Sequence, residues 1–175
     1  MNNTEYSQDE EDLLAQIGIT LLLVQDLEHL MSHCLKMIFG DKTIIRLDDL
    51  FGEDRRNLGR LIKTLQKSVD LSSKFEHLLE TVLEKRNLFV HRLRQQEWFD
   101  TQTEHGRMEV WKFVHDFYYE LEELIMIFNA FAFRQANELN MPETAEVRIL
   151  RERGFMQELE KHYMPRLDSL VSKRK

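Results

Sequence analysis

The sequence predicts an all-α fold, an antiparallel bundle of four main helices with additional helices toward the C-terminus. Three observations lead to this prediction. Only 6 of the 175 residues are Gly and 2 are Pro, so long uninterrupted elements are expected. Apolar residues recur at steps of three and four along most of the chain, the spacing of one helical face. With 42% hydrophobic and 31% charged residues, the composition is that of a globular domain.

The first predicted helix begins at the carboxylates of residues 9–12, which the helix dipole favours at this end, and it ends near Gly40. Asp54 is the expected cap of a second helix, whose apolar stripe follows directly. A turn is expected over residues 68–70. The third helix then runs from about residue 71 to residue 95 and carries a stripe of large apolar residues.

A polar linker over residues 96–106 precedes the fourth helix, which is expected from roughly residue 108 to residue 140. Pro142 suits the first turn of a short helix that ends at Gly154. A last helix is expected over residues 155–171.

These elements divide the chain into three parts. Residues 1–8 form a disordered N-terminal segment, and residues 9–140 form the helical bundle. Residues 141–175 form a C-terminal helical extension that packs on the bundle.

The net charge, the length of the apolar runs and the number of cysteines indicate where the protein is located and which kinds of partner it can bind. The formal net charge of −7 argues against nucleic-acid binding by the whole surface, although a local basic patch remains compatible. The longest near-continuous apolar stretch, residues 17–24, is far shorter than the roughly 20 residues that span a bilayer. The first residues lack the basic region of a signal peptide. Since Cys34 is the single cysteine, we expect a cytoplasmic protein without disulfides or a membrane anchor.

The most informative run, Glu84 to Arg92, closes the third predicted helix. At about 100° per residue, Arg86 falls in the middle of the apolar stripe that this helix should bury. An unpaired buried guanidinium is costly, so Arg86 needs an anionic partner or a special site. His91 can give or take a proton near neutral pH. A cation beside a proton-transfer group is what phosphodiester cleavage requires.

The helical positions of these residues leave two interpretations open. Asn87 and His91 are neighbours at i, i+4 on one flank of the stripe. Arg86 and His91 are roughly 140° apart on a straight helix. They are therefore expected to share a site only if the helix distorts or a second subunit brings its own copy alongside. The plainer interpretation pairs Arg86 with a buried carboxylate and leaves His91 on the flank.

The run from Arg86 to His91 resembles the R-x4-6-H motif of the HEPN superfamily, including the polar residue after the arginine. The resemblance covers about residues 10–135. HEPN proteins are small α-helical bundles, commonly dimers, and their active members are metal-independent endoribonucleases in which the motifs of two protomers face one another. The resemblance implies that Arg86 contacts the scissile phosphate, His91 transfers the proton, and Asn87 holds the phosphate or orients the histidine.

The resemblance also bears on partners. Toxins of the HepT type carry a tyrosine two residues after the histidine, which a cognate nucleotidyltransferase modifies. Here that position is Leu93, so an antitoxin of that kind is not predicted, while another protein partner or antitoxin remains open. Many HEPN proteins lack nuclease activity and act as binding or scaffold modules.

A basic cluster surrounds the motif and has two interpretations. Lys85, Arg92 and Arg94 could guide an RNA backbone toward it. Alternatively, they are solvated cations that compensate the dipole at the helix end.

Two further features of the helices have plainer interpretations. His29 and His33 are at i, i+4, a spacing that can hold a transition metal, but the run lacks the glutamate of an H-E-x-x-H site. We therefore expect partly exposed histidines, with neither a metal nor a cofactor, and a packing role for Cys34. On the fourth helix, Phe113, Tyr119 and Phe133 lie off the main stripe. They predict a second buried face, and hence a homodimer.

The leading hypothesis is a metal-independent endoribonuclease of the toxin, defence or stress type. The alternative is a non-catalytic HEPN-like module that binds a protein or a nucleotide. A DNA-binding regulator is a weaker alternative, because no helix-turn-helix pattern stands out. An enzyme should bring Arg86 and His91 together at an open cleft, whereas a binding module should bury Arg86 against a carboxylate and leave His91 isolated.

Overall fold

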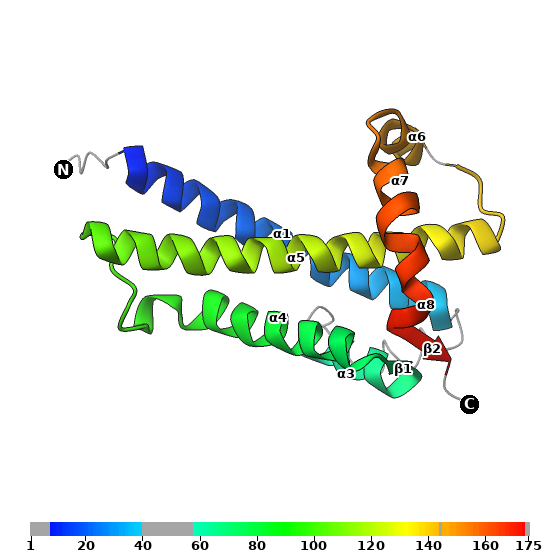
Figure 1. The fold of residues 1–175 in the computed structure, drawn as a ribbon, viewed down its shortest axis with the longest axis horizontal. Coiled ribbons are helices and arrows are strands. Elements are labelled where there is room, and N and C mark those ends of the chain that lie inside the picture. Colours follow the sequence, from blue (N-terminus) through cyan, green and yellow to red (C-terminus); the bar gives the residue numbers. More distant parts are fainter. Residues whose placement is uncertain (1–7, 40–57, 144, 174–175) are drawn as a thin grey trace.

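The computed structural model describes residues 8–39, 58–143 and 145–173, and these residues are mostly helical (Figure 1), which confirms the all-α class. Up to residue 140 the elements are α1 (Gln8–Phe39), α3 (Leu58–Ser68), β1 (Val69–Leu71), α4 (Ser73–His91), a 3-10 turn (Leu93–Gln95) and α5 (Glu104–Glu138). Beyond it come α6 (Ala145–Glu152), α7 (Phe155–Glu158), a π-helical turn (Leu159–Tyr163), a 3-10 turn (Met164–Arg166), α8 (Leu167–Leu170) and β2 (Val171–Lys173).

Helix α1 crosses α5, while α4 runs along α5 in the opposite direction (Figure 1). Three carboxylates in the first turn of α1 favour its start, as predicted. Its buried residues Val24, Leu27 and Met31 belong to the same core as the buried face of α5. The predicted ends at Gly40 and Asp54 lie outside the described residues.

One helix among the described residues, α1 over Gln8–Leu35, is long and apolar enough to span a membrane by length and composition. This apolar segment is longer than the stretch over residues 17–24, because the polar residues on either side of that stretch are too few to lower its mean hydropathy. In this structure the helix buries one face in the protein core and carries a buried, ion-paired Glu28. The cytoplasmic location stays a prediction.

The turn expected over residues 68–70 is instead a strand. β1 pairs with β2 in an antiparallel two-stranded sheet, with Val69 opposite Lys173 and Leu71 opposite Val171. Its pairing partner lies about a hundred residues away, so local sequence could not reveal it.

Helix α4 is shorter than the predicted span of residues 71–95. It begins after Ser72, whose hydroxyl accepts a hydrogen bond from the backbone N–H of Phe75 at 3.3 Å. It ends at His91, because Arg92 leaves the helical conformation with φ of −135° and ψ of 7°. A 3-10 turn follows.

The predicted linker over residues 96–106 is a folded turn, and α5 starts four residues earlier than expected. Asp100 accepts hydrogen bonds from the Thr103 hydroxyl at 2.6 Å and the Gln102 N–H at 2.8 Å. The hydrogen bond from Thr103 is the main reason that the pKa of Asp100 is lowered, and the bond from Gln102 lowers it further. The Thr103 hydroxyl also caps α5 by accepting from the Gly106 N–H at 3.2 Å.

The C-terminal part differs in detail from the predicted helices. The short helix starts at Ala145 rather than at Pro142, although Gly154, with φ of 81°, ends it as expected. The single helix predicted over residues 155–171 is largely observed, since α7, the π-helical turn, the 3-10 turn and α8 follow one another without a gap over residues 155–170. The hydrogen-bonding pattern of this helical segment changes near Pro165, which has no backbone N–H. Arg166 binds Glu123 of α5 at 2.9 Å and thereby ties this segment to the long helices.

The second apolar face predicted for the fourth helix is largely used within the chain. Phe113 packs against Trp98 and Phe117, with ring centroids 5.2 and 6.2 Å away. Phe133 packs against the core, and Tyr119 remains exposed. These residues therefore do not require a partner subunit, and the homodimer stays a prediction.

Two glycines predict opposite effects on stability. A Cβ at Gly106 would overlap the backbone oxygen of Asp100, whereas a Cβ at Gly18 would meet no atom within 4 Å. We expect Gly106→Ala to lower the free energy of unfolding by about 1–3 kcal/mol through overpacking. Gly18→Ala should raise it by about 0.5–1 kcal/mol through helix propensity. Urea denaturation measures both, and equal effects of the two substitutions would contradict the close approach at Gly106.

Candidate functional site

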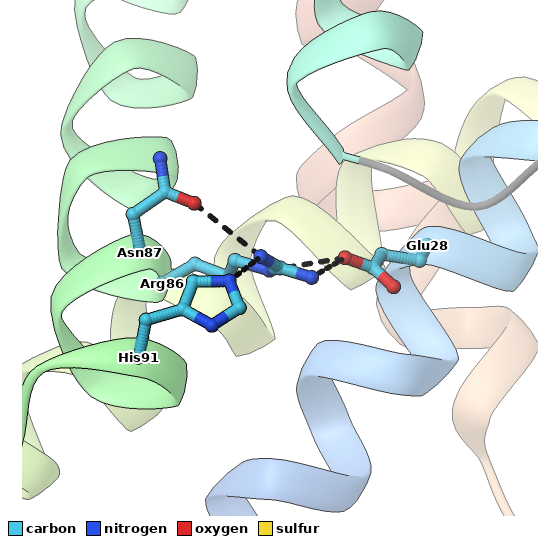
Figure 2. A network of polar contacts seen from close by, with 4 residues as sticks. All are labelled: Glu28, Arg86, Asn87 and His91. Carbon is cyan, nitrogen blue, oxygen red and sulfur yellow. Dashed lines mark hydrogen bonds and ion pairs between the residues drawn. The ribbon is translucent and has the colours of Figure 1, made fainter. Parts of the chain in front are cut away.

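The guanidinium of Arg86 lies at the centre of a polar network between α4 and α1 (Figure 2). Its Nε donates to Oε1 of Glu28 at 3.1 Å, and its Nη2 lies 2.9 Å from the same oxygen. Glu28 is only 8% exposed, and the Arg86 side chain is 14% exposed. Glu28 is thus the anionic partner that a buried arginine was expected to need.

The third nitrogen of the guanidinium faces the rest of the motif. Nη1 of Arg86 donates to Oδ1 of Asn87 at 3.3 Å and lies 3.1 Å from Nε2 of His91. Because a guanidinium only donates, Nε2 must be the acceptor in this contact. The network therefore assigns His91 as a neutral imidazole with its proton on Nδ1.

The expectation that Arg86 and His91 need a distorted helix or a second subunit is wrong. One chain brings their side chains within hydrogen-bond distance (Figure 2). The angle of roughly 140° describes only the directions in which the side chains leave the helix axis. An arginine side chain is long enough to turn along the helix surface, and His91 occupies the last residue of α4.

The predicted basic cluster does not gather at this network. Lys85 extends to α5, where its Nζ lies 2.7 Å from Oε1 of Glu120, whose Oε2 is buried without a partner among the described residues. Arg92 and Arg94 are exposed, and neither side chain forms an ion pair with another described residue. The structure thus brings together Arg86, Asn87 and His91, and separates Lys85 from them.

A cleft of about 760 Å³ opens beside His91. Its walls come from the N-terminal half of α1, the end of α4 and the segment over residues 93–102. Arg86 does not line this cleft, so His91 is the residue of the motif that both contacts Arg86 and lines the cleft. The site has one feature expected of each function. Arg86 is packed against the carboxylate of Glu28, as expected for a binding module, and His91 contacts Arg86 beside an open cleft, as expected for an enzyme.

The first helix shows no metal-site geometry at the residues considered. His29 and His33 are exposed, and within residues 8–39, 58–143 and 145–173 no three His, Cys, Asp or Glu side chains are placed to hold an ion. Cys34 is buried and its Sγ donates to the backbone oxygen of Phe128 at 3.3 Å. Burial raises the pKa of this thiol to about 12, which fits packing rather than nucleophilic chemistry.

Sequence reasoning missed Glu28 as the partner of Arg86. It lies on the apolar side of α1, one turn after Val24 and three residues before Met31, both of which are buried. One carboxylate in the apolar stripe of α1 and one guanidinium in the apolar stripe of α4 suggest that the two residues form an ion pair. The sequence alone does not show whether the two helices pack with these residues at the same height.

Comparison with known proteins found no match to a family model, to a curated protein or to a solved structure.

The buried ion pair predicts a large effect of removing one partner. Glu28→Ala should lower the free energy of unfolding by about 3 kcal/mol, because Arg86 is left charged and buried. Glu143→Ala breaks an exposed pair with Arg151 and should cost less than about 1 kcal/mol. The double variant Glu28→Met with Arg86→Met should recover much of the loss. Urea unfolding curves measure the free energy of unfolding of each variant. Equal effects of Glu28→Ala and Glu143→Ala would contradict the predicted importance of the pair between Glu28 and Arg86.

Cys34 should react with thiol reagents only when the chain unfolds. With its pKa at about 12, very little thiolate exists at pH 8, and burial also blocks access. The measurement is the rate of modification by a chromogenic disulfide at pH 8, with and without 6–8 M urea. Modification in the native state as fast as in urea would show that the position of Cys34 in the core is wrong.

Proposed function

We propose that this protein is a metal-independent endoribonuclease of HEPN type that cleaves RNA in a toxin, defence or stress role in the cytoplasm. The observation that supports this proposal is the 3.1 Å contact between Nη1 of Arg86 and Nε2 of His91 beside an open cleft. We also propose that α1, α3, α4 and α5 form the four-helix bundle of that superfamily, in which α4 runs antiparallel to α5 (Figure 1), and that two copies pair with their motifs facing one another.

The proposed reaction is attack of a ribose 2′-OH on the adjacent phosphorus. The oxygen–phosphorus bond forms as the 2′-OH proton passes to Nε2 of His91, and the bond to the 5′-oxygen of the next nucleotide breaks. The leaving 5′-oxygen takes a proton from water or from a protonated histidine of the second copy. The products are a 2′,3′-cyclic phosphate end and a 5′-hydroxyl end.

Glu28 determines how Arg86 can take part in this reaction. The carboxylate holds Nε and Nη2, so Nη1 is the nitrogen that remains for a phosphate oxygen. When a phosphate oxygen replaces Nε2 of His91 as an acceptor from Nη1, the lone pair on Nε2 becomes available for the 2′-OH proton. The positive charge of Arg86 then stabilises the charge that develops on the phosphorane.

The neighbouring polar residues have supporting roles in the proposal. Asn87 accepts from Arg86 through Oδ1, which leaves its amide N–H groups for a phosphate oxygen. Arg92 and Arg94 are the exposed cations that guide the backbone, and their contribution weakens with added salt. Lys85 contributes only if it leaves Glu120.

A second candidate function is a non-catalytic module that binds a protein or a nucleotide. The buried pair of Glu28 and Arg86 favours it, because such a pair fixes the packing of two helices without any substrate. In that case His91 only completes the hydrogen bonding of the guanidinium.

Cleavage in the presence of EDTA distinguishes these functions. We expect the purified protein to cleave single-stranded RNA in EDTA and to leave 2′,3′-cyclic phosphate ends. His91→Ala should lower the rate by about 10²–10⁴-fold, because the proton-transfer group is lost. The assay follows a 5′-labelled RNA on a denaturing gel, with the cyclic end identified by its resistance to a phosphatase before acid treatment.

His77→Ala is the matched control, since His77 is an exposed histidine on the same helix, away from the motif. It should cleave like the unchanged protein. If a folded protein leaves RNA intact, or if His91→Ala retains full activity, the ribonuclease proposal fails and the binding module is favoured.

A further inference from the structure

Apolar side chains from three segments of the chain line the cleft beside His91. Leu14 and Ile17 of α1, Val90 of α4 and Phe99 of the following segment all line it. Leu14 is 47% exposed and Val90 is 38% exposed, although both lie in well-formed helices. Apolar side chains that meet in an open concavity are a common lining for a bound ligand.

Polar residues also line the cleft. The side chains of Gln95 and Gln102 are among them, and neither side-chain amide hydrogen-bonds to another described residue. Arg94 supplies positive charge, and Glu10 supplies one carboxylate. An occupant should therefore combine an apolar face with hydrogen-bonding edges and a nearby anionic group.

The cleft is held in shape by the turn that precedes α5. Arg107 donates to the backbone oxygens of Thr101 and Gln102, both at 3.2 Å. Asp100 accepts from Thr103 in the same turn, and its backbone packs directly over Gly106. A volume of about 760 Å³ lies within the usual range for small-molecule sites, roughly 300–1,000 Å³.

We infer that this cleft is a subsite for an unpaired nucleobase of the RNA strand, adjoining the phosphate that Arg86 and His91 engage. This inference rests on the proposed function. A nucleobase has apolar faces that can stack on Phe99 or contact Leu14 and Val90, which line the same cleft. Its edge reaches the free amides, Glu10 can accept from an exocyclic amino group, and Arg94 meets the phosphate backbone.

The inference restricts the substrate to single-stranded RNA. A base inside a duplex is stacked above and below and paired at its edge, so it cannot enter a cleft between two helices and a turn. The base next to the scissile phosphate must be unstacked, as in a loop, a bulge or an unpaired strand.

Binding of an RNA analogue that cannot be cleaved tests the subsite separately from catalysis. The probe is a fluorescein-labelled hexanucleotide of 2′-O-methyl ribonucleotides, which lacks the attacking 2′-OH, and binding is followed by fluorescence anisotropy. We expect the single strand to bind at least tenfold more tightly than the same strand annealed to its complement. A strand of equal charge whose sugars carry no bases should bind roughly tenfold more weakly.

Two exposed leucines on α1 provide a matched pair of variants. Leu14 lines the cleft, whereas Leu22 is 60% exposed and does not line it. Leu14→Gln and Phe99→Leu should each weaken binding of the hexanucleotide by roughly tenfold, and Leu22→Gln should leave it unchanged. Circular dichroism melting shows whether each variant is folded, and Leu14→Gln keeps the measurement independent of the packing of Phe99.

The outcomes separate this inference from the proposed function. Base-dependent binding that is lost in Leu14→Gln supports the subsite, even if the protein does not cleave RNA. The inference is overturned if single strand and duplex bind equally, if the strand without bases binds as well, or if Leu14→Gln binds like Leu22→Gln. It is also overturned if no oligonucleotide binds, and in that case a protein segment would be the occupant to seek.

Discussion

The candidate site depends on the ion pair between Glu28 of α1 and Arg86 of α4. Both helices pack on α5, and the pair spans the space between them (Figure 2). Both charges are almost removed from water, so each is tolerable only in the presence of the other. This constraint fixes the orientation of the guanidinium, and the orientation decides which of its nitrogens reaches His91. The packing of the helices thus determines the ion pair, and the ion pair determines which nitrogen of Arg86 can act in the proposed reaction.

The cleft beside His91 depends on a second constraint, the close approach of Asp100 to Gly106. That approach folds the segment after α4 back against the start of α5 and so makes the third wall of the cleft. His91, the last residue of α4, is affected by both constraints. It contacts the ion-paired guanidinium of Arg86 and also lines the cleft, as the proposed proton transfer requires.

Sequence periodicity predicted what depends on neighbours along the chain. It indicated the long helices, the burial of Arg86 and its need for an anion, because a charge inside an apolar stripe is visible in a helical pattern. It did not yield the pairing of Glu28 with Arg86 or the strand pairing of Val69–Leu71, since each depends on segments far apart in the sequence. The prediction that Arg86 and His91 are too far apart on one helix was wrong for another reason. The angle between two positions around a helix axis ignores the length of the side chains and their direction along the helix.

The structural and the catalytic interpretations of Arg86 do not exclude one another. A guanidinium has five N–H donors in a fixed plane, and Glu28 occupies the edge formed by Nε and Nη2. Within the described residues the opposite nitrogen, Nη1, contacts only Asn87 and His91, two neutral acceptors that an anionic phosphate oxygen can replace. An arginine anchored on one edge loses little conformational entropy when a phosphate binds at the other. In the proposed function, the same ion pair that joins the two helices therefore also positions Nη1 for the phosphate of the substrate.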